Sequence, residues 1–439
     1  MRIPCAVLPR LPCAVLAAVL LCAAFSGCGR TAAESSALPD PETTEHEVTT
    51  MTIATTVSTT ADPFGTQPDK TAAETDRRTS ARMTASTAAR QTASSPAQTG
   101  KPTQSAATTF KKSERNVERI GRFAADGDGA WLFEWSGSTV TAGFTGTGIG
   151  IRLAVVKGGP YGEEDYLNVS VDGGTPFVLT VKKGVTSYRL ADGLPNGYHH
   201  VRVTKRTEAQ FGCQLRFSGF DYGDGEPAPA PARRERRIEI YGDSLSAGYG
   251  NEGTQPGFRL PEENADLTYG ALTAAALGAE YTTVALSGHG MALSLSGSKT
   301  EVLPKYMART LYKDNIAYRF DAPAPQAVIV NLGTNDYAAG VADADYYQAY
   351  LTFLSDLRRK YPRAYIVCTT CGGTDKAVDI LERVVQVRRD KNKDSRIAHF
   401  VGIIEDPDGA FGSDGHPSVY GHRQLAEQLT AFLQEELGW

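Results

Sequence analysis

Apolar and polar residues alternate with period two from residue 113 to 226, and glycine and aspartate interrupt the alternation repeatedly. This pattern predicts short β-strands that each bury one face. Asp172-Gly173-Gly174 is typical of a tight turn between two such strands. The predicted strands cover residues 139–144, 148–155, 166–171, 177–181, 198–204 and 214–220. Their short length and close spacing predict an all-β, jelly-roll-like sandwich domain over residues 113–226.

Proline alternates with alanine at the start of the next segment, residues 227–235. Proline restricts φ and donates no backbone hydrogen bond, so we expect a short, semi-rigid linker there. From 236 to 439, apolar runs alternate with amphipathic helical patterns, as in a parallel sheet that is covered on both faces. The predicted strands are 238–241, 281–286, 327–331, 364–370 and 400–404, and the predicted helices are 343–360, 374–391 and 417–437. This order predicts an α/β domain with a flavodoxin-like, three-layer architecture.

The N-terminal segment, residues 1–28, is typical of an export signal. Arg2 and Arg10 accompany an apolar run that is too short to span a bilayer. It ends in Phe25-Ser26-Gly27-Cys28, which resembles a bacterial lipobox, so we expect Cys28 to be lipidated; secretion without a lipid is the alternative. Residues 29–112 are rich in Thr, Ser and Ala and predict a disordered stalk. Together these features predict an extracellular protein that is held at the bacterial cell surface by its lipid alone.

Charge and cysteine content restrict the partners and cofactors. The formal net charge of −5 argues against nucleic-acid binding, which favours a basic face. Only Cys213, Cys368 and Cys371 follow the N-terminal segments, and no second cluster completes the ligand set of a zinc site. We therefore expect buried thiols and neither a metal nor another cofactor. Each domain is long enough for its own core, so a monomer is expected.

Four short motifs follow predicted strands or precede predicted helices in the C-terminal domain. The first is Gly242-Asp243-Ser244, at the end of the strand at 238–241. The others are Ser287-Gly288-His289-Gly290, Gly333-Thr334-Asn335-Asp336 and Asp414-Gly415-His416-Pro417. In this order they resemble the four blocks of the SGNH (GDSL-type) hydrolases, which are named after their Ser, Gly, Asn and His residues. The resemblance covers residues 236–439.

Ester hydrolysis by a serine requires an activated hydroxyl and a base that takes its proton. We expect Ser244 to be the nucleophile and His416 the base, with His289 as a competing histidine. Asp414 is expected to orient the ring of His416. It stands two residues before the histidine, whereas the acid of the broad SGNH pattern stands three before it, here at Ser413. A backbone carbonyl that orients the ring instead would leave a Ser–His dyad.

The oxyanion of the tetrahedral intermediate needs hydrogen-bond donors. The expected donors are the backbone N–H groups of Ser244 and Gly288 and the side-chain amide of Asn335. Asp336 and Asp243 are expected to brace their loops and to take no part as catalytic acids.

A narrower resemblance rests on both domains. Residues 242–250, together with 130–138, 144–147 and 203–208 of the predicted sandwich, resemble the family-2 carbohydrate esterases. Members of that family share the Asp-x-His spacing, and the resemblance extends from about residue 117 to the C-terminus. It implies that the enzyme removes acetyl groups from hemicellulose, such as xylan, glucomannan or their oligosaccharides, without a metal. Gly415 offers no aromatic surface for a sugar ring next to the base.

Two alternatives of other classes remain open. The first is an SGNH lipase or lysophospholipase, although no strongly apolar lid is evident between residues 291 and 320. The second is a non-catalytic, carbohydrate-binding surface lipoprotein in which the sandwich is the working part. That alternative predicts the loss of at least one catalytic position, and all of them are present.

Overall fold

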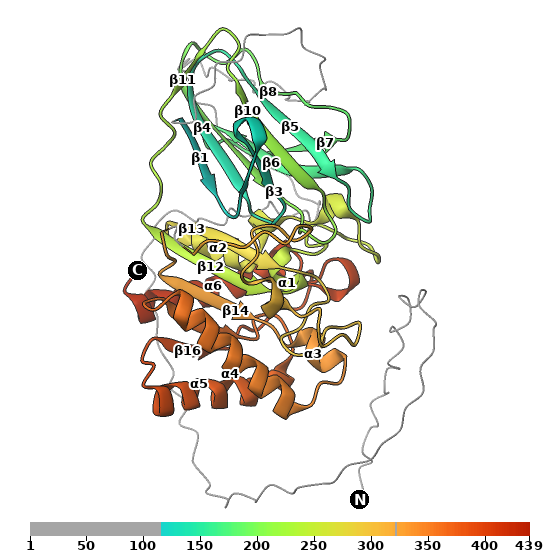
Figure 1. The fold of residues 1–439 in the computed structure, drawn as a ribbon, viewed down its shortest axis with the longest axis vertical. Helices are drawn as coiled ribbons and strands as arrows, with labels where there is room; N and C mark the ends of the chain where they lie inside the picture. Colours follow the sequence, from blue (N-terminus) through green and yellow to red (C-terminus); the bar gives the residue numbers. More distant parts are fainter. Residues whose placement is uncertain (1–115, 321–322) are drawn as a thin grey trace, which may run out of the picture. The chain divides into compact units, whose positions relative to one another are not determined.

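The computed structural model describes residues 116–320 and 323–439, which form the domains drawn in colour in Figure 1. Three expected features lie wholly or partly outside the described residues: the export signal with Cys28, the stalk at 29–112, and residues 113–115 of the sandwich. None of the helices within the described ranges combines the length and the hydrophobicity that a membrane span requires.

Two antiparallel sheets form the sandwich. The first has the order β1-β4-β9-β6-β7, and β11 pairs with the part of β4 that β1 leaves free. The second has the order β2-β3-β10-β5-β8. The strands are β1 (Val117–Ile120), β2 (Ala124–Asp126), β3 (Ala130–Phe133), β4 (Thr139–Gly146), β5 (Ile149–Lys157), β6 (Glu164–Val171), β7 (Phe177–Lys182), β8 (Tyr188–Ala191), β9 (Gly197–Lys205), β10 (Gln214–Asp221) and β11 (Glu226–Ala228). The predicted all-β sandwich is thus confirmed, and β1, β2, β3, β8 and β11 add strands to those expected.

Alternate residues of these strands fill the space between the two sheets. In β5, Ile149, Ile151 and Leu153 are buried, and Val201 and Val203 of β9 meet them from the other sheet. The period-two alternation in the sequence therefore reports which face of each strand packs into the core.

The expected linker differs from the structure in its first residues. β11 includes Pro227 and Ala228, which pair with Phe144 and Gly143 of β4. A proline is tolerated in this position because β11 is short and pairs on one side only, so the missing N–H removes no bond from the interior of the sheet. Residues 229–235 then connect the sandwich to the first strand of the α/β domain.

A five-stranded parallel sheet forms the centre of the C-terminal domain, with the order β13-β12-β14-β15-β16. This order is that of flavodoxin-like folds, and its reversal lies between β12 and β14. The helices α2 and α6 cover one face of the sheet and α4 and α5 cover the other (Figure 1). The elements are β12 (Arg236–Gly242), β13 (Ala279–Ala285), β14 (Ala327–Asn331), β15 (Tyr365–Thr369), β16 (Ile397–Phe400), α1 (Ser244–Ala247), α2 (Tyr269–Ala276), α3 (Thr334–Ala338), α4 (Asp343–Lys360), α5 (Val378–Asn392) and α6 (Val419–Leu437). The predicted three-layer α/β fold is confirmed.

Several boundaries differ from the sequence expectation. Helix α5 begins at Val378 and not at 374, and β13 begins at Ala279 and not at 281. The last strand is Ile397–Phe400 and not 400–404, because Ile397 is buried whereas Ile403 is 57% exposed at the surface. The last helix begins at Val419, since the Ser418 side chain caps it by accepting from Gly421 N–H. Pro417 thus lies before the cap and not in the first helical position.

Buried polar contacts join the sandwich to the α/β domain. Arg122 is 2% exposed and donates to Glu239 Oε1 of β12 at 2.7 Å and to Met307 O at 2.7 Å. Trp135 is almost completely buried and donates from its indole nitrogen to Thr310 O at 2.9 Å. A buried arginine that loses its carboxylate partner destabilises the folded protein. The contacts of Arg122 therefore hold the sandwich and the α/β domain in one arrangement.

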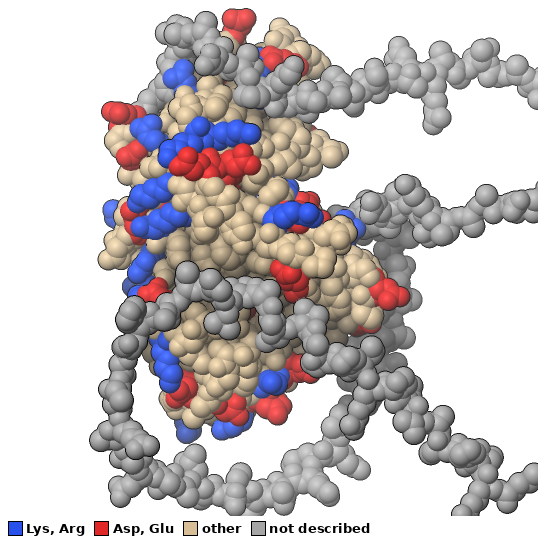
Figure 2. Space-filling view, turned by 90° about the vertical axis from the view of Figure 1, so that its right-hand side faces the viewer, with Lys and Arg blue, Asp and Glu red and all other residues tan. Residues whose placement is uncertain are grey.

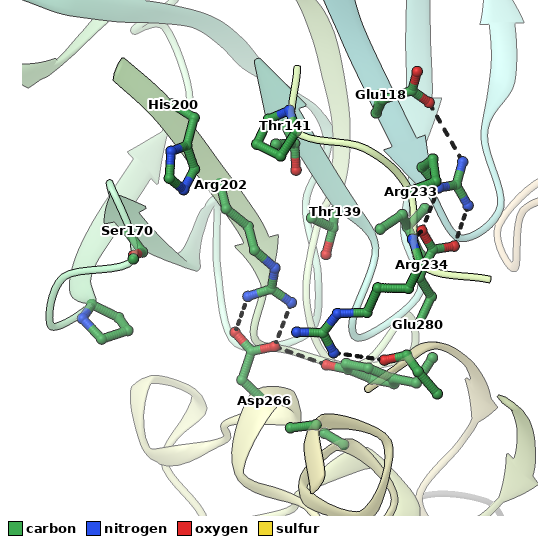
Figure 3. Close-up of a pocket in the computed structure, with 18 of the residues that line it drawn as sticks. Glu118, Thr139, Thr141, Ser170, His200, Arg202, Arg233, Arg234, Asp266 and Glu280 are labelled. Carbon is green, nitrogen blue, oxygen red and sulfur yellow. Dashed lines mark hydrogen bonds and ion pairs between the residues drawn. The ribbon is translucent and has the colours of Figure 1, made fainter. Parts of the chain in front are cut away.

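A cleft of about 520 Å³ lies where the sandwich, residues 231–234 and α2 meet (Figure 3). Arg202 and Asp266 form a two-pronged ion pair across it, and Arg233 pairs with Glu280. The residues of the four motifs do not line this cleft. On the face drawn in Figure 2, basic and acidic side chains lie beside one another and form no large area of one charge.

Candidate active site

Ser244 begins α1 just after β12, at the carboxyl end of that strand and next to the reversal in strand order. The Asp243 side chain caps this short helix by accepting from Leu245 N–H at 3.1 Å. A side chain on Gly242 would come within 2.0 Å of Ser246 Oγ, so only glycine allows the turn to close this tightly. The sequence thereby places the hydroxyl where open α/β sheets bind their ligands.

His416 lies opposite this serine, in the segment between the 3-10 turn Ser413–Gly415 and α6. Its Nε2 is 2.8 Å from Ser244 Oγ. With the proton on Nδ1, Nε2 accepts from the hydroxyl, which is the arrangement of a general base and its nucleophile. The structure therefore brings together the two residues on which the expected chemistry depends.

Burial lowers the pKa of His416 below its usual value, against the opposing effects of the Ser413 backbone and the Asp414 charge. A lowered pKa keeps the imidazole neutral at neutral pH, as a base requires. Its Nδ1 is buried and has no side-chain hydrogen-bond partner among the described residues, and the backbone groups of Ser413 and Asp414 lie near the ring.

Asp414 does not hold the ring of His416 as expected. Its carboxylate accepts from Tyr249 Oη at 3.0 Å and from Gly257 N–H at 2.8 Å. The backbone of Asp414 is left-handed, with φ of 53°, and the side chain leaves the turn towards the loop around Gly257. Its carboxylate therefore contacts that loop and not the ring of His416. This arrangement is compatible with the alternative, in which a backbone carbonyl orients the ring.

The two other histidines of this region have different surroundings. His289 is buried, and its Nδ1 lies 3.1 Å from Ser287 O while its ring packs edge-on against Tyr306. His422 accepts from Tyr269 N–H at 3.1 Å, and burial lowers its pKa to about 3. Neither histidine has a hydrogen bond to Ser244 in the described structure, whereas His416 does.

Asn335 lies in the first turn of α3 and joins three of the motifs. Its Nδ2 donates to His289 O at 3.0 Å and to Asp243 Oδ2 at 3.2 Å. Gly288, the expected second donor, has φ of 74°, a conformation that favours glycine. The amide and this backbone turn therefore lie in loops that are bound to each other, at the same edge of the sheet as Ser244.

Asp243 and Asp336 brace loops, as expected. Asp336 accepts from Met291, Ala292 and Leu293 N–H at 2.7, 2.7 and 2.9 Å. Asp243 is fully buried, and burial first, then the charge of Asp336, raises its pKa to about 7.

One buried acid was missed because it comes from the other domain. Glu208 of the sandwich accepts from Ser287 N–H at 2.8 Å and from the Ser287 hydroxyl. Burial raises the pKa of this carboxyl to about 7. Ser287 precedes Gly288, so the sandwich holds the loop that carries an expected oxyanion donor. The segment 203–208 was noted for its resemblance, but no local pattern shows that it reaches this loop.

The comparisons with known proteins cover both domains. Residues 119–231 match the model of the carbohydrate esterase 2 N-terminal domain, and residues 240–424 match that of the GDSL-like lipase/acylhydrolase family. The chain is 30% identical over 295 residues to an acetylxylan esterase/glucomannan deacetylase of Cellvibrio japonicus, covering 63% of this chain and 79% of that protein.

Two further relatives are a curated cellulase/esterase and a solved carbohydrate esterase. The chain is 34% identical over 328 residues to the cellulase/esterase CelE of Acetivibrio thermocellus, covering 73% of this chain but only 39% of that protein. A solved family-two carbohydrate esterase from Clostridium thermocellum, in complex with cellohexaose, is 33% identical with a TM-score of 0.68 and covers 74% of this chain and 99% of that one. With its two matched domains and these relatives, the chain belongs to the family-2 carbohydrate esterases, whose catalytic domain has the SGNH (GDSL-type) hydrolase fold.

Proposed function

We propose that this protein is a serine esterase that removes O-acetyl groups from plant cell-wall polysaccharides or oligosaccharides, such as xylan and glucomannan. The observation that carries the proposal is the 2.8 Å contact between Ser244 Oγ and His416 Nε2 at the carboxyl end of β12. The named activities of the relatives supply the substrate class.

The reaction proceeds in two halves. Ser244 Oγ attacks the acetyl carbonyl while His416 Nε2 takes its proton, and the tetrahedral intermediate forms with a negative oxygen. When the intermediate collapses, the ester C–O bond breaks and His416 returns the proton to the sugar oxygen. Water, deprotonated by the same nitrogen, then attacks the acetyl-serine, and acetate leaves with Ser244 regenerated.

The negative oxygen is held by backbone N–H groups of Ser244 and Gly288 and by the Asn335 amide. Asn335 Nδ2 already has two acceptors, of which Asp243 Oδ2 at 3.2 Å is the more distant. In this proposal the amide turns from Asp243 towards the oxyanion as charge develops. The Asp243 carboxyl, whose pKa lies at about 7, can take up a proton when that contact is lost.

The test is acetate release by the full chain from acetylated xylan and from acetylated glucomannan, with long-chain acyl esters in parallel. Acetate from either glycan, with little cleavage of the long-chain esters, supports the proposal and ranks the two substrates. Cleavage of the long-chain esters alone would point to a lipase, and inertness on every ester to a binding protein.

Asp414→Asn is expected to lower kcat/KM less than tenfold. Asparagine keeps an oxygen for Tyr249 Oη or Gly257 N–H, and the carboxylate makes no bond to His416 that could be lost. In a Ser-His-Asp triad the same change lowers kcat by about 10⁴-fold, as in the well-studied serine proteases. Steady-state acetate release decides between the two, and a loss in the thousandfold range would restore Asp414 as the orienting acid.

The pH profile of kcat/KM is expected to rise along one acid limb that lies below pH 6.5. The active base is neutral His416, and burial lowers its pKa, so activity is lost only as the pH falls through that lowered value. Asp414→Asn removes a charge that raises this pKa and should move the limb to lower pH. Because Asp243 and Glu208 are common to both proteins, the difference between the two profiles reports on His416. If the acid limb of Asp414→Asn lies at the same pH as that of the wild type, the limb reports the titration of a group other than His416.

A second, separate proposal concerns the cellular location of the protein and rests on the sequence of residues 1–112. We propose that the protein is exported and held outside the cell as a monomer by a lipid on Cys28, as the sequence of residues 25–28 indicates. Cells fed a labelled fatty acid should label the wild type but not Cys28→Ala. Label that persists in the variant would contradict the anchor while leaving the esterase proposal intact.

A further inference from the structure

Aromatic rings from both domains gather next to the catalytic histidine. We call Tyr161, Phe211, Tyr249 and Phe258 the aromatic platform. The ring of Tyr249 lies 4.3 Å from that of His416, centroid to centroid, and 4.2 Å from that of Phe258, on which it stacks with an interplanar angle of 25°. A continuous apolar surface thus begins at the ring of the base.

The sandwich supplies half of this platform. Tyr161 lies in the connection between β5 and β6, and Phe211 follows β9. Their ring centroids are 5.1 and 5.3 Å from that of Phe258 and 5.4 Å from each other. The N-terminal domain therefore reaches the neighbourhood of the catalytic residues with two rings.

None of these rings belongs to the main hydrophobic core of either domain. All four lie outside the buried hydrophobic clusters of the sandwich and of the α/β layers. Phe211, Tyr249 and Phe258 are half-buried because they pack against one another, whereas Tyr161 is 49% exposed and forms the open side of the platform. An exposed aromatic ring of this kind commonly marks a binding surface, because an apolar ring face gains free energy when a ligand covers it.

Polar groups line the edge of the platform nearest to His416. The exposed carboxylate of Asp414 is held there by Tyr249 Oη and Gly257 N–H, and the latter bond also fixes the loop that carries Phe258. Gly415 leaves open space beside them, since a Cβ at this position would meet nothing within 4 Å. A ligand here would find apolar faces and, at one edge, a hydrogen-bond acceptor.

The charge of the surroundings favours a neutral ligand. Burial, and after it the negative charges of Glu208, Glu263 and Asp414, raise the pKa of the Tyr161 hydroxyl. The exposed carboxylate of Asp414 would repel an anionic group from the platform. A neutral pyranose matches it, since its C–H groups form an apolar face and its hydroxyls lie around the rim.

The direction of the reaction places the sugar on this side. His416 returns its proton to the oxygen that leaves with the sugar, so that sugar must lie next to Nε2 and hence next to the ring of Tyr249. We propose that the aromatic platform binds the neutral sugar ring whose acetyl group is removed, or the next ring of the chain, by stacking. This inference rests on the proposed esterase function and identifies the sugar subsite within it. It makes the sandwich part of the substrate site.

Kinetics on two substrates test the platform in the full chain. Tyr161→Ala and Phe258→Ala should each raise KM for an acetylated xylo-oligosaccharide about three- to tenfold, since one aromatic contact has roughly that effect. Ethyl acetate has no sugar ring. For this substrate, the factor by which each variant lowers kcat/KM should be at least threefold smaller than for the oligosaccharide. Tyr161→Trp, which retains a ring, should restore the low KM. The control is Tyr198→Ala, which removes a tyrosine that is 53% exposed elsewhere on the sandwich and should leave both substrates unaffected.

A binding measurement separates this inference from the esterase proposal. Calorimetry with unacetylated xylohexaose and glucomannan oligosaccharides, on Ser244→Ala, should detect binding that weakens when Phe258→Ala is added. Equal losses on glycan and ethyl acetate would show that the rings only support His416, and unchanged KM and binding would also overturn the platform. Oligosaccharide binding that depends on Phe258, without acetate release by the wild type, would reject the esterase proposal but keep the sugar site.

Discussion

Replacement of Ser244 by alanine is expected to abolish acetate release, with kcat falling roughly 10⁶-fold, as for the nucleophile of the protease subtilisin. The hydroxyl is the group that His416 Nε2 contacts, and alanine removes the atom on which the acetyl group is carried. Folding should be preserved, because the backbone bonds of α1 and the cap from Asp243 do not involve the hydroxyl. Acetate release and thermal unfolding of the variant measure both effects.

Ser246→Ala is the matched control, two residues further along α1. Its hydroxyl is also buried and hydrogen-bonded, to Tyr269 Oη at 2.8 Å, but it does not contact His416. Loss of this bond should cost about 1 kcal/mol of stability and leave kcat within about tenfold. Acetate release by Ser244→Ala at more than a thousandth of the wild-type rate would exclude this serine as the nucleophile.

The fold could be predicted from the sequence wherever burial follows a simple period. Helix α4 and strand β14 have the expected bounds, because their apolar residues face a single layer or are buried on both sides. The strand predicted at residues 400–404 was misplaced. Apolar residues at the surface, such as Ile403, give the same sequence pattern as those of a buried strand. β11 was not predicted, because it is a strand only through its pairing with β4, whose residues are distant in the sequence.

The site could be predicted as far as residues lie at strand ends. Ser244 and Asn335 follow β12 and β14, and the carboxyl ends of parallel strands share one edge of a sheet. His416 reaches Ser244 from the segment before α6. The direction of the Asp414 carboxylate depends on a left-handed backbone and on the loop at Gly257, and the spacing of residues specifies neither. Glu208 lies in another domain, so only the docked structure shows that it holds the loop before Gly288.

His416→Ala is expected to lower kcat by roughly 10⁴-fold or more, an effect comparable to the loss of the serine. The ring is the base in acylation, the acid for the leaving sugar and the base again in deacylation, so its loss affects every proton transfer. The Asp414 charge and the Ser413 backbone favour the imidazolium that forms in each half-reaction, although burial outweighs them in the resting enzyme. Single-turnover acetate release, with and without added imidazole, measures the loss and its rescue.

His289→Asn is the decisive comparison, because His289 is the competing histidine of the second motif. Asparagine retains a donor for Ser287 O, so the loop before Gly288 keeps its contact while the imidazole is removed. We expect this variant to lose less than about 100-fold in kcat, as befits a residue that packs against Tyr306. Imidazole should accelerate His416→Ala by filling the space beside Tyr249, and should not accelerate His289→Asn. The opposite pattern, a larger loss and rescue by imidazole at His289, would move the base to the second motif. It would also detach the aromatic platform from the leaving sugar, since the platform adjoins His416 alone of these two histidines.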